Sequence, residues 1–262
     1  MRTFTFLFFI FSLFTSVVYA QFLQPVEKKI DIDKKVTPAW VLTVDEEKDP
    51  LIESAEDYTK EELGVKLKGR RDLLIAEEVR IPSIAFHTGD LKIQFSSVGS
   101  ETQIAVAFMP GYDISLNSQD NPQEMERLRQ FTRNLVKYHK VSFLQQTIAD
   151  DEKRLRDLES SLKKNQREYK RLDKQAARMD RQINSSKTDE NKKFDLENDL
   201  KAAQDRMETL EGTEGELEDE IAGMNDKIYV SQTKINDIEN KFAENEATVT
   251  SESELEPDDY DQ

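Results

Sequence analysis

Two long runs of residues at heptad spacing, between Val141 and Phe242, constrain the fold of this chain more than any other feature. Mostly apolar residues recur in alternating steps of three and four, the spacing of the a and d positions that form the seam of a coiled coil. The first run comprises Val141, Leu144, Ile148, Asp151, Leu155, Leu158, Leu162, Asn165, Tyr169, Leu172, Ala176, Met179 and Ile183. The second run comprises Leu196, Leu200, Ala203, Met207, Leu210, Glu214, Leu217, Ile221, Met224, Ile228, Ser231, Ile235, Ile238 and Phe242. We call these residues the seam, and they predict two long helices.

The polar segment 184–191 separates the two runs and gives the chain a place to turn back on itself. An antiparallel pairing that sets Ile183 opposite Leu196 keeps apolar residues together along both runs. It also places Asn165 opposite Glu214, so that two polar interruptions of the seam share one layer. A shift by one heptad destroys this match. The sequence therefore predicts an antiparallel coiled-coil hairpin in this register.

The charge of the two runs favours the same pairing. Residues 121–187 contain 17 Lys and Arg against 10 Asp and Glu, a net charge of +7, whereas residues 188–242 contain 7 against 16, a net charge of −9. A basic helix beside an acidic one favours this hairpin over a parallel self-dimer of like with like. The flanking charges are mixed in this register: Arg154 with Glu220 and Glu168 with Arg206 are opposite in sign, whereas Glu159 with Glu218 and Asp180 with Glu197 would repel. Individual ion pairs therefore decide little.

Composition and missing motifs exclude several functions. The chain has 262 residues, of which 34% are charged, and it has no Cys, which excludes disulfides, a thiolate nucleophile and Cys-based metal sites. A formal charge of −16 argues against nucleic acid as a partner. No Gly-rich phosphate loop, nucleophile elbow or zinc-protease motif occurs, and the two histidines, His87 and His139, lack partners at catalytic or ligand spacing. We therefore expect no catalytic residue, no cofactor, no metal site and no enzyme activity.

The N-terminus has the features of a signal peptide. Arg2 precedes an apolar run from Phe4 to Val18, and Ala20 ends a plausible cleavage site. The run is shorter than the roughly 20 residues that a membrane-spanning helix needs, although an uncleaved anchor is the alternative. We therefore expect residues 1–20 to be removed. The mature chain would then be exported to the periplasm or the extracellular space and would not be an integral membrane protein.

Residues 38–120 predict a small α+β head domain after an extended arm at 21–37, which is charged and weakly patterned. Short alternating strands surround one amphipathic helix at 50–63, which we expect to be capped by Asp49 and to end at Gly64. The order β-α-β4-α predicts a small antiparallel sheet with helices on one face. This order resembles helix-grip, TBP-like folds, which often hold a small apolar ligand under their helices. With about 75 residues in strands and one helix, a filled core is the expectation here.

The remaining domain boundaries follow from composition. Asn121, Pro122 and Glu124 predict the start of a long helix, so the coiled-coil hairpin should span 121–242 with its tip at 184–191. Thr188 or Ser186 is the expected cap of the return helix. Residues 243–262 contain 8 acidic residues and no basic ones, which predicts an acidic disordered tail.

Two surfaces of the hairpin are candidate functional sites. Cations at the outward b, c and f positions of the first helix form a basic stripe: Lys153, Arg156, Lys163, Lys164, Arg167, Lys170, Arg171, Lys174, Arg178 and Arg181. This stripe is either a solvated helix face or a contact for an anionic lipid surface, an acidic protein or the acidic tail of another copy. Asn165 and Glu214, flanked by Gly212 and Gly215, are either a layer that specifies the register or a hinge. Asp151, opposite Ile228, has no such polar partner in this register.

The sequence thus favours a non-enzymatic exported scaffold or adaptor that binds an unknown protein partner in the envelope, with a homo-oligomer as an option. One alternative is a holdase chaperone, because a body with long helical arms resembles the Skp-like periplasmic chaperones. In this chain, however, the body precedes the hairpin entirely, and the chain is acidic where those chaperones are basic. Another alternative is a lipid- or small-ligand-binding head domain on a coiled-coil stalk.

Overall fold

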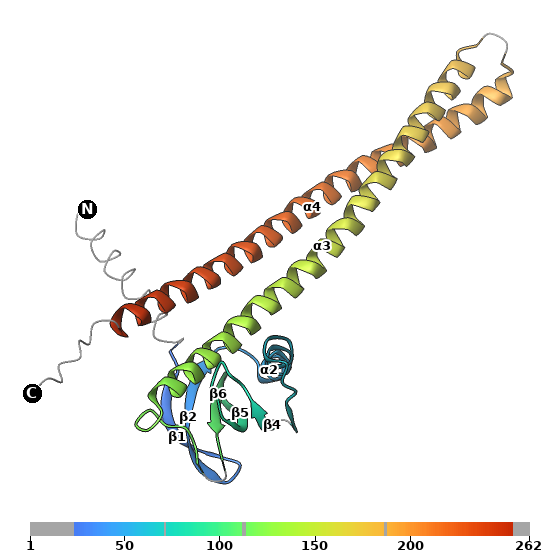
Figure 1. The fold of residues 1–262 in the computed structure, drawn as a ribbon. Coiled ribbons are helices and arrows are strands. Elements are labelled where there is room, and N and C mark those ends of the chain that lie inside the picture. The colour runs from blue at the N-terminus through green and yellow to red at the C-terminus, as the bar shows by residue number, and fades with distance from the viewer. Residues whose placement is uncertain (1–23, 71, 112–113, 186–187, 254–262) are drawn as a thin grey trace, which may run out of the picture. The chain divides into compact units, whose positions relative to one another are not determined.

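The structure of the chain, a computed structural model, describes residues 24–70, 72–111, 114–185 and 188–253 (Figure 1). It divides into two compact units, Met1–Ser142 with Phe242–Gln262 and Phe143–Lys241. The fold class is α+β, as predicted, with a six-stranded antiparallel sheet, helices and a long C-terminal helical region. The predicted signal peptide lies outside the described residues.

The sheet belongs to the first unit and has the strand order β1-β2-β6-β5-β4-β3, with every neighbouring pair antiparallel. The strands are β1 (Val26–Ile32), β2 (Lys35–Val44), β3 (Lys68–Arg70), β4 (Leu73–Arg80), β5 (Thr88–Val98) and β6 (Glu101–Met109). In β5 the apolar residues Leu91, Ile93 and Phe95 alternate with polar ones, and in β6 large apolar residues alternate with alanines, which is why the sequence predicted these strands.

Strand β1 lies within residues 21–37, which were predicted to form an extended arm. The strand itself was not predicted. Val26 pairs with Val41 and Ile32 pairs with Lys35. Most of β1 is exposed because it is an edge strand, and only Ile32 at its end is buried. Its sequence therefore lacks the alternation that marks a half-buried strand, and pairing with β2 decides its structure.

Helix α2 (Lys48–Leu63) begins two residues earlier than its predicted start. Its N-cap is Glu47, which makes no side-chain capping bond, so the prediction that Asp49 caps this helix was wrong. Asp49 instead lies within the first turn, where the positive end of the helix dipole stabilises its carboxylate. Gly64 ends the helix in the left-handed conformation at φ 64°, as predicted from its lack of a side chain.

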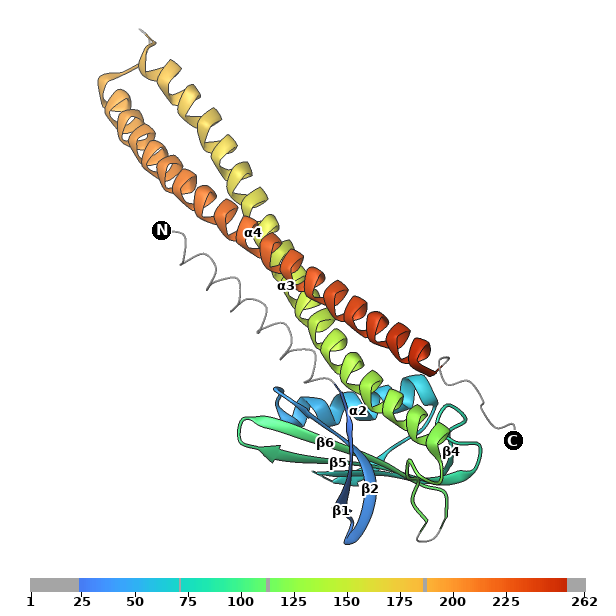
Figure 2. The same ribbon diagram turned by 90° about the vertical axis from the view of Figure 1, so that its left-hand side faces the viewer.

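The main core of the first unit lies between the sheet and two helices. Leu51, Ala55 and Tyr58 of α2 share one buried cluster with Leu128 and Phe131 of α3 (Pro122–Ile183). Ile104, Val106 and Phe108 of β6 and Leu91, Ile93 and Phe95 of β5 complete the cluster from the sheet. Figures 1 and 2 show α2 and the first turns of α3 over the same face of the sheet. The helix-covered side of the head is therefore filled by side chains.

The opposite face of the sheet carries a second, smaller core. Alternate residues of a strand point to opposite faces, so Ala105 and Ala107 lie on the side away from the helices. They pack with Ile32, Ala39 and Val41, where β1 and β2 meet. The small alanine side chains keep this cluster thin, and Lys92, Gln94 and Ser96 of β5 make the neighbouring part of this face polar.

Two long helices follow the sheet: α3, which begins at Pro122 as predicted, and α4 (Glu190–Ser253). The boundary between the two units falls within α3, after Ser142. Asp189 caps α4, because its Oδ1 accepts a hydrogen bond from the backbone N–H of Asn191 at 3.1 Å. The predicted cap Thr188 instead donates its hydroxyl to the carbonyl of Gln182 at 2.7 Å, and Ser186 lies outside the described residues.

The backbone of α4 continues to Ser253, well into the segment predicted to be a disordered tail. Residues 243–253 contain no Gly or Pro that would stop a helix, and the next Pro is Pro257. The high content of acidic residues therefore did not by itself end the helix. Residues 254–262 of the predicted tail lie outside the described part of the chain.

Candidate functional site

In the second unit, every buried residue of α3 and α4 belongs to the seam. Every seam residue is buried or partly buried, whereas every residue at an outward b, c or f position within 149–181 and 198–240 is exposed. Leu172, Ala203 and Leu210 form a buried cluster that Tyr169 and Met207 extend. This burial pattern follows the heptad spacing along both helices.

Polar contacts fix which residues of the two helices lie side by side. Arg206 Nε contacts Glu168 Oε1 at 3.1 Å, and Arg154 contacts Glu220 at 4.0 Å. Both are pairs of opposite charge in the predicted register. Because all four side chains are at least partly exposed, each pair contributes little to stability and mainly marks the alignment.

The layer of Asn165 and Glu214 differs from the prediction in one respect. The side chain that reaches Glu214 is that of Gln166, whose Nε2 donates to Glu214 Oε1 at 2.8 Å. The Nδ2 of Asn165 is buried and has no hydrogen-bond partner among the described residues. One turn away, Tyr169 donates its hydroxyl to Glu211 at 2.7 Å, and this bond raises the pKa of Tyr169. The structure thus brings Asn165 and Glu214 to one level without a direct bond between them.

Gly212 and Gly215, which flank this layer, lie on the outward side of α4 together with Gly223. A Cβ atom added at any of these glycines would meet no other atom within 4 Å. No packing within the described residues therefore requires a glycine at these positions. Glycine lowers the intrinsic stability of a helix, so these residues reduce the stability of α4, and the hinge stays a prediction.

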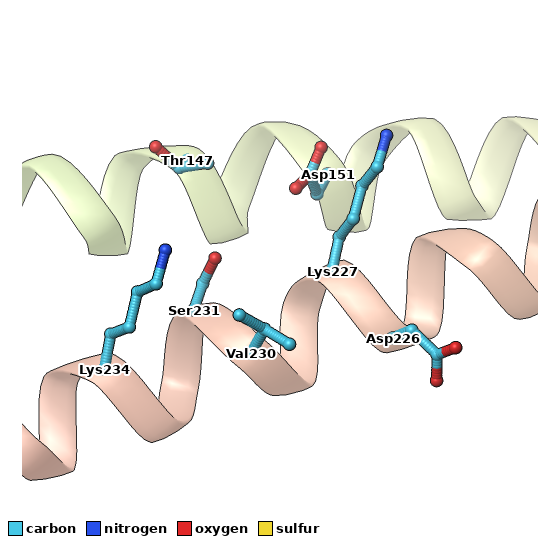
Figure 3. Close-up of a pocket in the computed structure, with 7 residues that line it drawn as sticks. All are labelled: Thr147, Asp151, Asp226, Lys227, Val230, Ser231 and Lys234. Carbon is cyan, nitrogen blue, oxygen red and sulfur yellow. The ribbon is translucent and has the colours of Figure 1, made fainter. Parts of the chain in front are cut away.

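A second polar stretch of the seam surrounds Asp151 and was missed by sequence reasoning. A pocket of about 370 Å³ between the helices is lined by Thr147, Asp151, Asp226, Lys227, Val230, Ser231 and Lys234. In Figure 3, Lys227 extends from α4 alongside Asp151, and Asp226 points away. Asp151 therefore lies near polar groups of α4 and not only opposite apolar Ile228. The sequence does contain a sign of this polar stretch, because the polar residue Ser231 occupies a seam position one turn from Ile228.

All ten residues of the basic stripe are exposed. Within the described residues only Arg156 among them forms an ion pair, with Glu152 on the same helix at 3.9 Å. The other nine side chains form no ion pair with any described acidic residue. The stripe is thus a continuous cationic surface along one helix.

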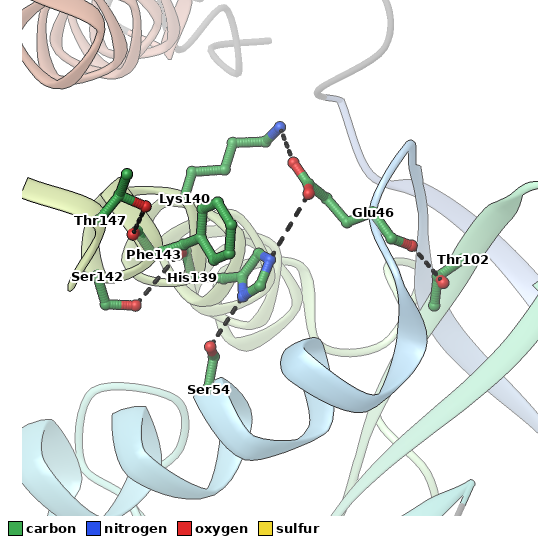
Figure 4. A network of polar contacts seen from close by, with 8 residues as sticks. All are labelled: Glu46, Ser54, Thr102, His139, Lys140, Ser142, Phe143 and Thr147. Carbon is green, nitrogen blue, oxygen red and sulfur yellow. Dashed lines mark hydrogen bonds and ion pairs between the residues drawn. The ribbon is translucent and has the colours of Figure 1, made fainter. Parts of the chain in front are cut away.

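His139 occupies a buried polar network in the first unit, with 3% of its surface exposed (Figure 4). Its Nδ1 lies 2.8 Å from Ser54 Oγ on α2, and its Nε2 lies 3.9 Å from a carboxylate oxygen of Glu46. The same carboxylate accepts a bond from Lys140 at 2.8 Å. Burial lowers the pKa of His139, which favours the neutral ring. These contacts join α3 to α2 and to the loop before α2, so His139 has a structural role. The other histidine, His87, is exposed.

A polar groove of about 850 Å³ on the sheet of the first unit is a site that the sequence did not predict. It is lined by Lys35, Lys68, Glu77, Glu78, Thr88, Gly89, Asp90, Lys92, Met109, Pro110 and Gly111. Lys92 is 7% exposed and contacts Asp33 at 3.1 Å, a pairing across strands that local sequence does not reveal.

The rim of this groove contains an irregularity in strand β4. The pairing of β4 with β5 shifts between Ala76 and Val79, and within this bulge Glu78 has a φ of +52°. The backbone N–H of Glu78 donates to Asp90 Oδ1 at 2.9 Å, which holds this strained conformation. The residue before Asp90 must be a glycine, because a Cβ at Gly89 would lie 2.5 Å from the carbonyl oxygen of Met109.

Comparison of the chain with protein-family models, with curated proteins and with solved structures finds no match. Within the described residues, no group of three or more His, Asp or Glu side chains is placed to hold a metal ion. No described helix combines the length and the apolar character needed to cross a membrane.

Proposed function

We propose that the protein is a non-enzymatic exported scaffold or adaptor, in which α3 and α4 form an antiparallel coiled-coil hairpin that docks or spaces protein partners in the periplasm or envelope. One observation carries the proposal: seam residues of both helices are shielded, while the outward positions within 149–181 and 198–240 are exposed. A helix pair that closes its own apolar seam presents charged faces to other molecules. Such faces suit reversible docking of a protein partner.

The register of the hairpin is supported by contacts spread along it. Glu168 with Arg206 and Gln166 with Glu214 lie on the same stretch, and Arg154 with Glu220 lies nearly two heptads away. Pairs at both places agree with antiparallel helices without a slip. A register maintained over this length makes the hairpin a spacer of defined length.

Cross-linking mass spectrometry in intact cells tests both parts of the proposal. A lysine-specific cross-linker should join Lys153 to Lys227 within one chain, and it should also join the hairpin to a defined partner protein. Replacing the tip 184–191 by Gly and Ser residues of equal number should abolish the partner link while Lys153 remains linked to Lys227. Absence of the internal link would contradict the hairpin, and an unchanged partner link would contradict docking at the tip.

The holdase alternative predicts a different result. A holdase should prevent aggregation of an unfolded outer-membrane protein when mixed at a one-to-one ratio, whereas a scaffold should leave the aggregation rate unchanged. Light scattering of the diluted, unfolded client measures this directly. Suppression that persists in the tip-replaced variant would favour the holdase.

A ligand-binding head is a second candidate, favoured specifically by the groove at Lys92. Because three lysines and three acidic residues line it, a polar ligand carrying both charges fits this groove better than the small apolar ligand that helix-grip folds often hold. Native mass spectrometry of the intact chain should show a bound small molecule that is lost in Lys92→Met and kept in Lys28→Met, where the lysine is exposed. Equal spectra for both variants would reject this candidate.

A further inference from the structure

The outward face of α3 between Lys153 and Arg181 is almost entirely cationic. Its b, c and f positions hold the ten residues of the basic stripe and a single acidic residue, Asp157, with Ser160 and Ala177 as the neutral positions. All of them are exposed. Long cationic side chains at every turn of a helix repel each other, so this face gains most from a partner that supplies negative charge.

The outward face of α4 has the opposite character. Between Ala202 and Asp226 its b, c and f positions hold five exposed acidic residues and no basic one: Asp205, Glu208, Glu216, Asp219 and Asp226. The other positions on this face are Ala202, Thr209, Gly212, Gly215, Ala222 and Gly223. These small residues leave room for long lysine and arginine side chains to approach the carboxylates.

The two faces lie at the same level of the second unit. Contacts of Arg154 with Glu220 and of Glu168 with Arg206 place residues 154–168 beside residues 206–220. The two faces are therefore at the same level of α3 and α4, which lie side by side in Figures 1 and 2. They point outward, so they cannot neutralise each other within one chain.

We infer that the partner of the basic stripe is a second copy of this chain, whose α4 offers its acidic outward face to α3. This inference rests on the proposed hairpin. Two hairpins packed side by side about a two-fold axis along their length place α3 of each copy beside α4 of the other, so that the flanking b or c positions of the basic stripe lie next to those of the acidic face. An extended anionic surface such as a membrane fits less well, because the acidic face and the net charge of −16 oppose its approach.

Sedimentation equilibrium of the chain without residues 1–20 tests the inference. We expect a dimer in about 0.05 M NaCl, with a dissociation constant that rises at least about tenfold in about 0.5 M NaCl, since exposed charges are screened over a few ångströms at high salt. A monomer at low salt would overturn the inference. So would a dimer whose dissociation constant does not change with salt.

Charge reversal identifies the faces that meet. The triple variant Lys163→Glu, Arg167→Glu, Lys170→Glu makes the central stretch 160–170 of the α3 face acidic, and Glu208→Lys, Glu216→Lys, Asp219→Lys makes the stretch 208–219 of the α4 face basic. Each variant alone should be monomeric. Over this central stretch one variant is then acidic on both helices and the other is basic on both, so their mixture should form a heterodimer, and failure of this rescue would overturn the inference. The changed residues are exposed, and circular dichroism should show unchanged helix content.

A matched control carries the same change of net charge elsewhere. Lys28, Lys29 and Lys66 are exposed residues of the first unit, and reversing all three to Glu should leave the dimer intact. The internal cross-link between Lys153 and Lys227 distinguishes the two proposals, because its loss contradicts the hairpin, whereas a monomer that keeps it contradicts only self-association. Binding of the unchanged chain, as a monomer, to phosphatidylserine vesicles would assign the stripe to lipid instead and would also overturn the inference.

Discussion

His139 is a buried titratable side chain whose two ring nitrogens face different groups. Ser54 contacts Nδ1, while the carboxylate of Glu46 lies near Nε2 and is shared with the ammonium of Lys140. Burial lowers the pKa of the ring below its ordinary value of 6.5, and the nearby carboxylate only partly offsets this effect. The neutral ring is therefore the form that the folded first unit accommodates.

This arrangement predicts a loss of stability in mild acid. The unfolded chain binds a proton at His139 with the ordinary pKa of 6.5, and the folded chain only at lower pH. The stability carried by the neutral ring is thus complete above pH 6.5 and falls as the pH drops toward the folded-state pKa. Replacement by His139→Gln should remove this part of the pH dependence. Urea unfolding followed by the fluorescence of Trp40, the single tryptophan, measures it between pH about 7.5 and about 5.

His87→Gln provides the control for this measurement, because His87 is exposed. It should leave the difference in unfolding free energy between the two pH values unchanged. An equal pH dependence in the wild-type chain and His139→Gln would contradict the role given to burial.

At the scale of a single element, the seam of α4 stabilises the helix, whereas its outward face contains residues that destabilise it. Its seam residues, among them Leu210, Met224 and Ile235, are buried and support a long helix. Its outward face carries three glycines at which an added Cβ would meet no atom of the described residues within 4 Å, and glycine costs about 1 kcal/mol relative to alanine within a helix. Helix α4 is therefore stabilised by packing of its seam residues and not by the helix propensity of its outward residues.

Replacing these glycines should stabilise α4. Each of Gly212→Ala, Gly215→Ala and Gly223→Ala should raise the free energy of unfolding by about 0.5–1 kcal/mol, because the added Cβ meets open space. Thermal unfolding followed by circular dichroism at the helix band measures the effect.

The matched control is Gly89→Ala in β5, where the added Cβ would lie 2.7 Å from a ring carbon of Phe108 and closer still to a backbone oxygen. This change should destabilise the chain by about 1–3 kcal/mol. Destabilisation by the α4 substitutions would show that another contact uses these glycines.

At the scale of the whole molecule, the first unit is assembled from distant parts of the chain. Phe242, near the end of α4, belongs to this unit and is 3% exposed. Its ring lies under the cationic groups of Arg133 and Lys137 of α3, at 5.7 and 5.8 Å from the ring centroid. The first unit therefore includes a residue that follows the entire second unit in sequence.

The burial of Phe242 in the first unit predicts that Phe242→Ala should destabilise this unit. Truncating a buried phenylalanine costs about 3 kcal/mol, and here two cation–π contacts are lost with it. Urea unfolding followed by Trp40 fluorescence should shift to lower denaturant, because Trp40 lies in this unit and donates its Nε1 to the carbonyl of Met125 at 2.7 Å. Phe194→Ala, at a position of the same helix that is 65% exposed, should change the transition by less than about 0.5 kcal/mol. Equal effects of both substitutions would rule out a specific role for Phe242.

The amino-acid sequence by itself determined the long helices and their shielded residues. Heptad spacing is a local property, so a seam residue such as Leu172 or Leu210 can be recognised without knowledge of the rest of the fold. The same holds for the start of α3 at Pro122 and the end of α2 at Gly64, because a proline and a glycine set backbone conformations on their own.

Only the tertiary structure decided the remaining features. Strand β1 exists because β2 offers it a pairing edge, and its own charged residues give no sign of it. Burial of Lys92 beside Asp33 and of His139 beside Ser54 depends on segments 59 and 85 residues apart in the chain. The energy of such contacts is set by the removal of water and by partners brought close in space, and neither is encoded in local spacing.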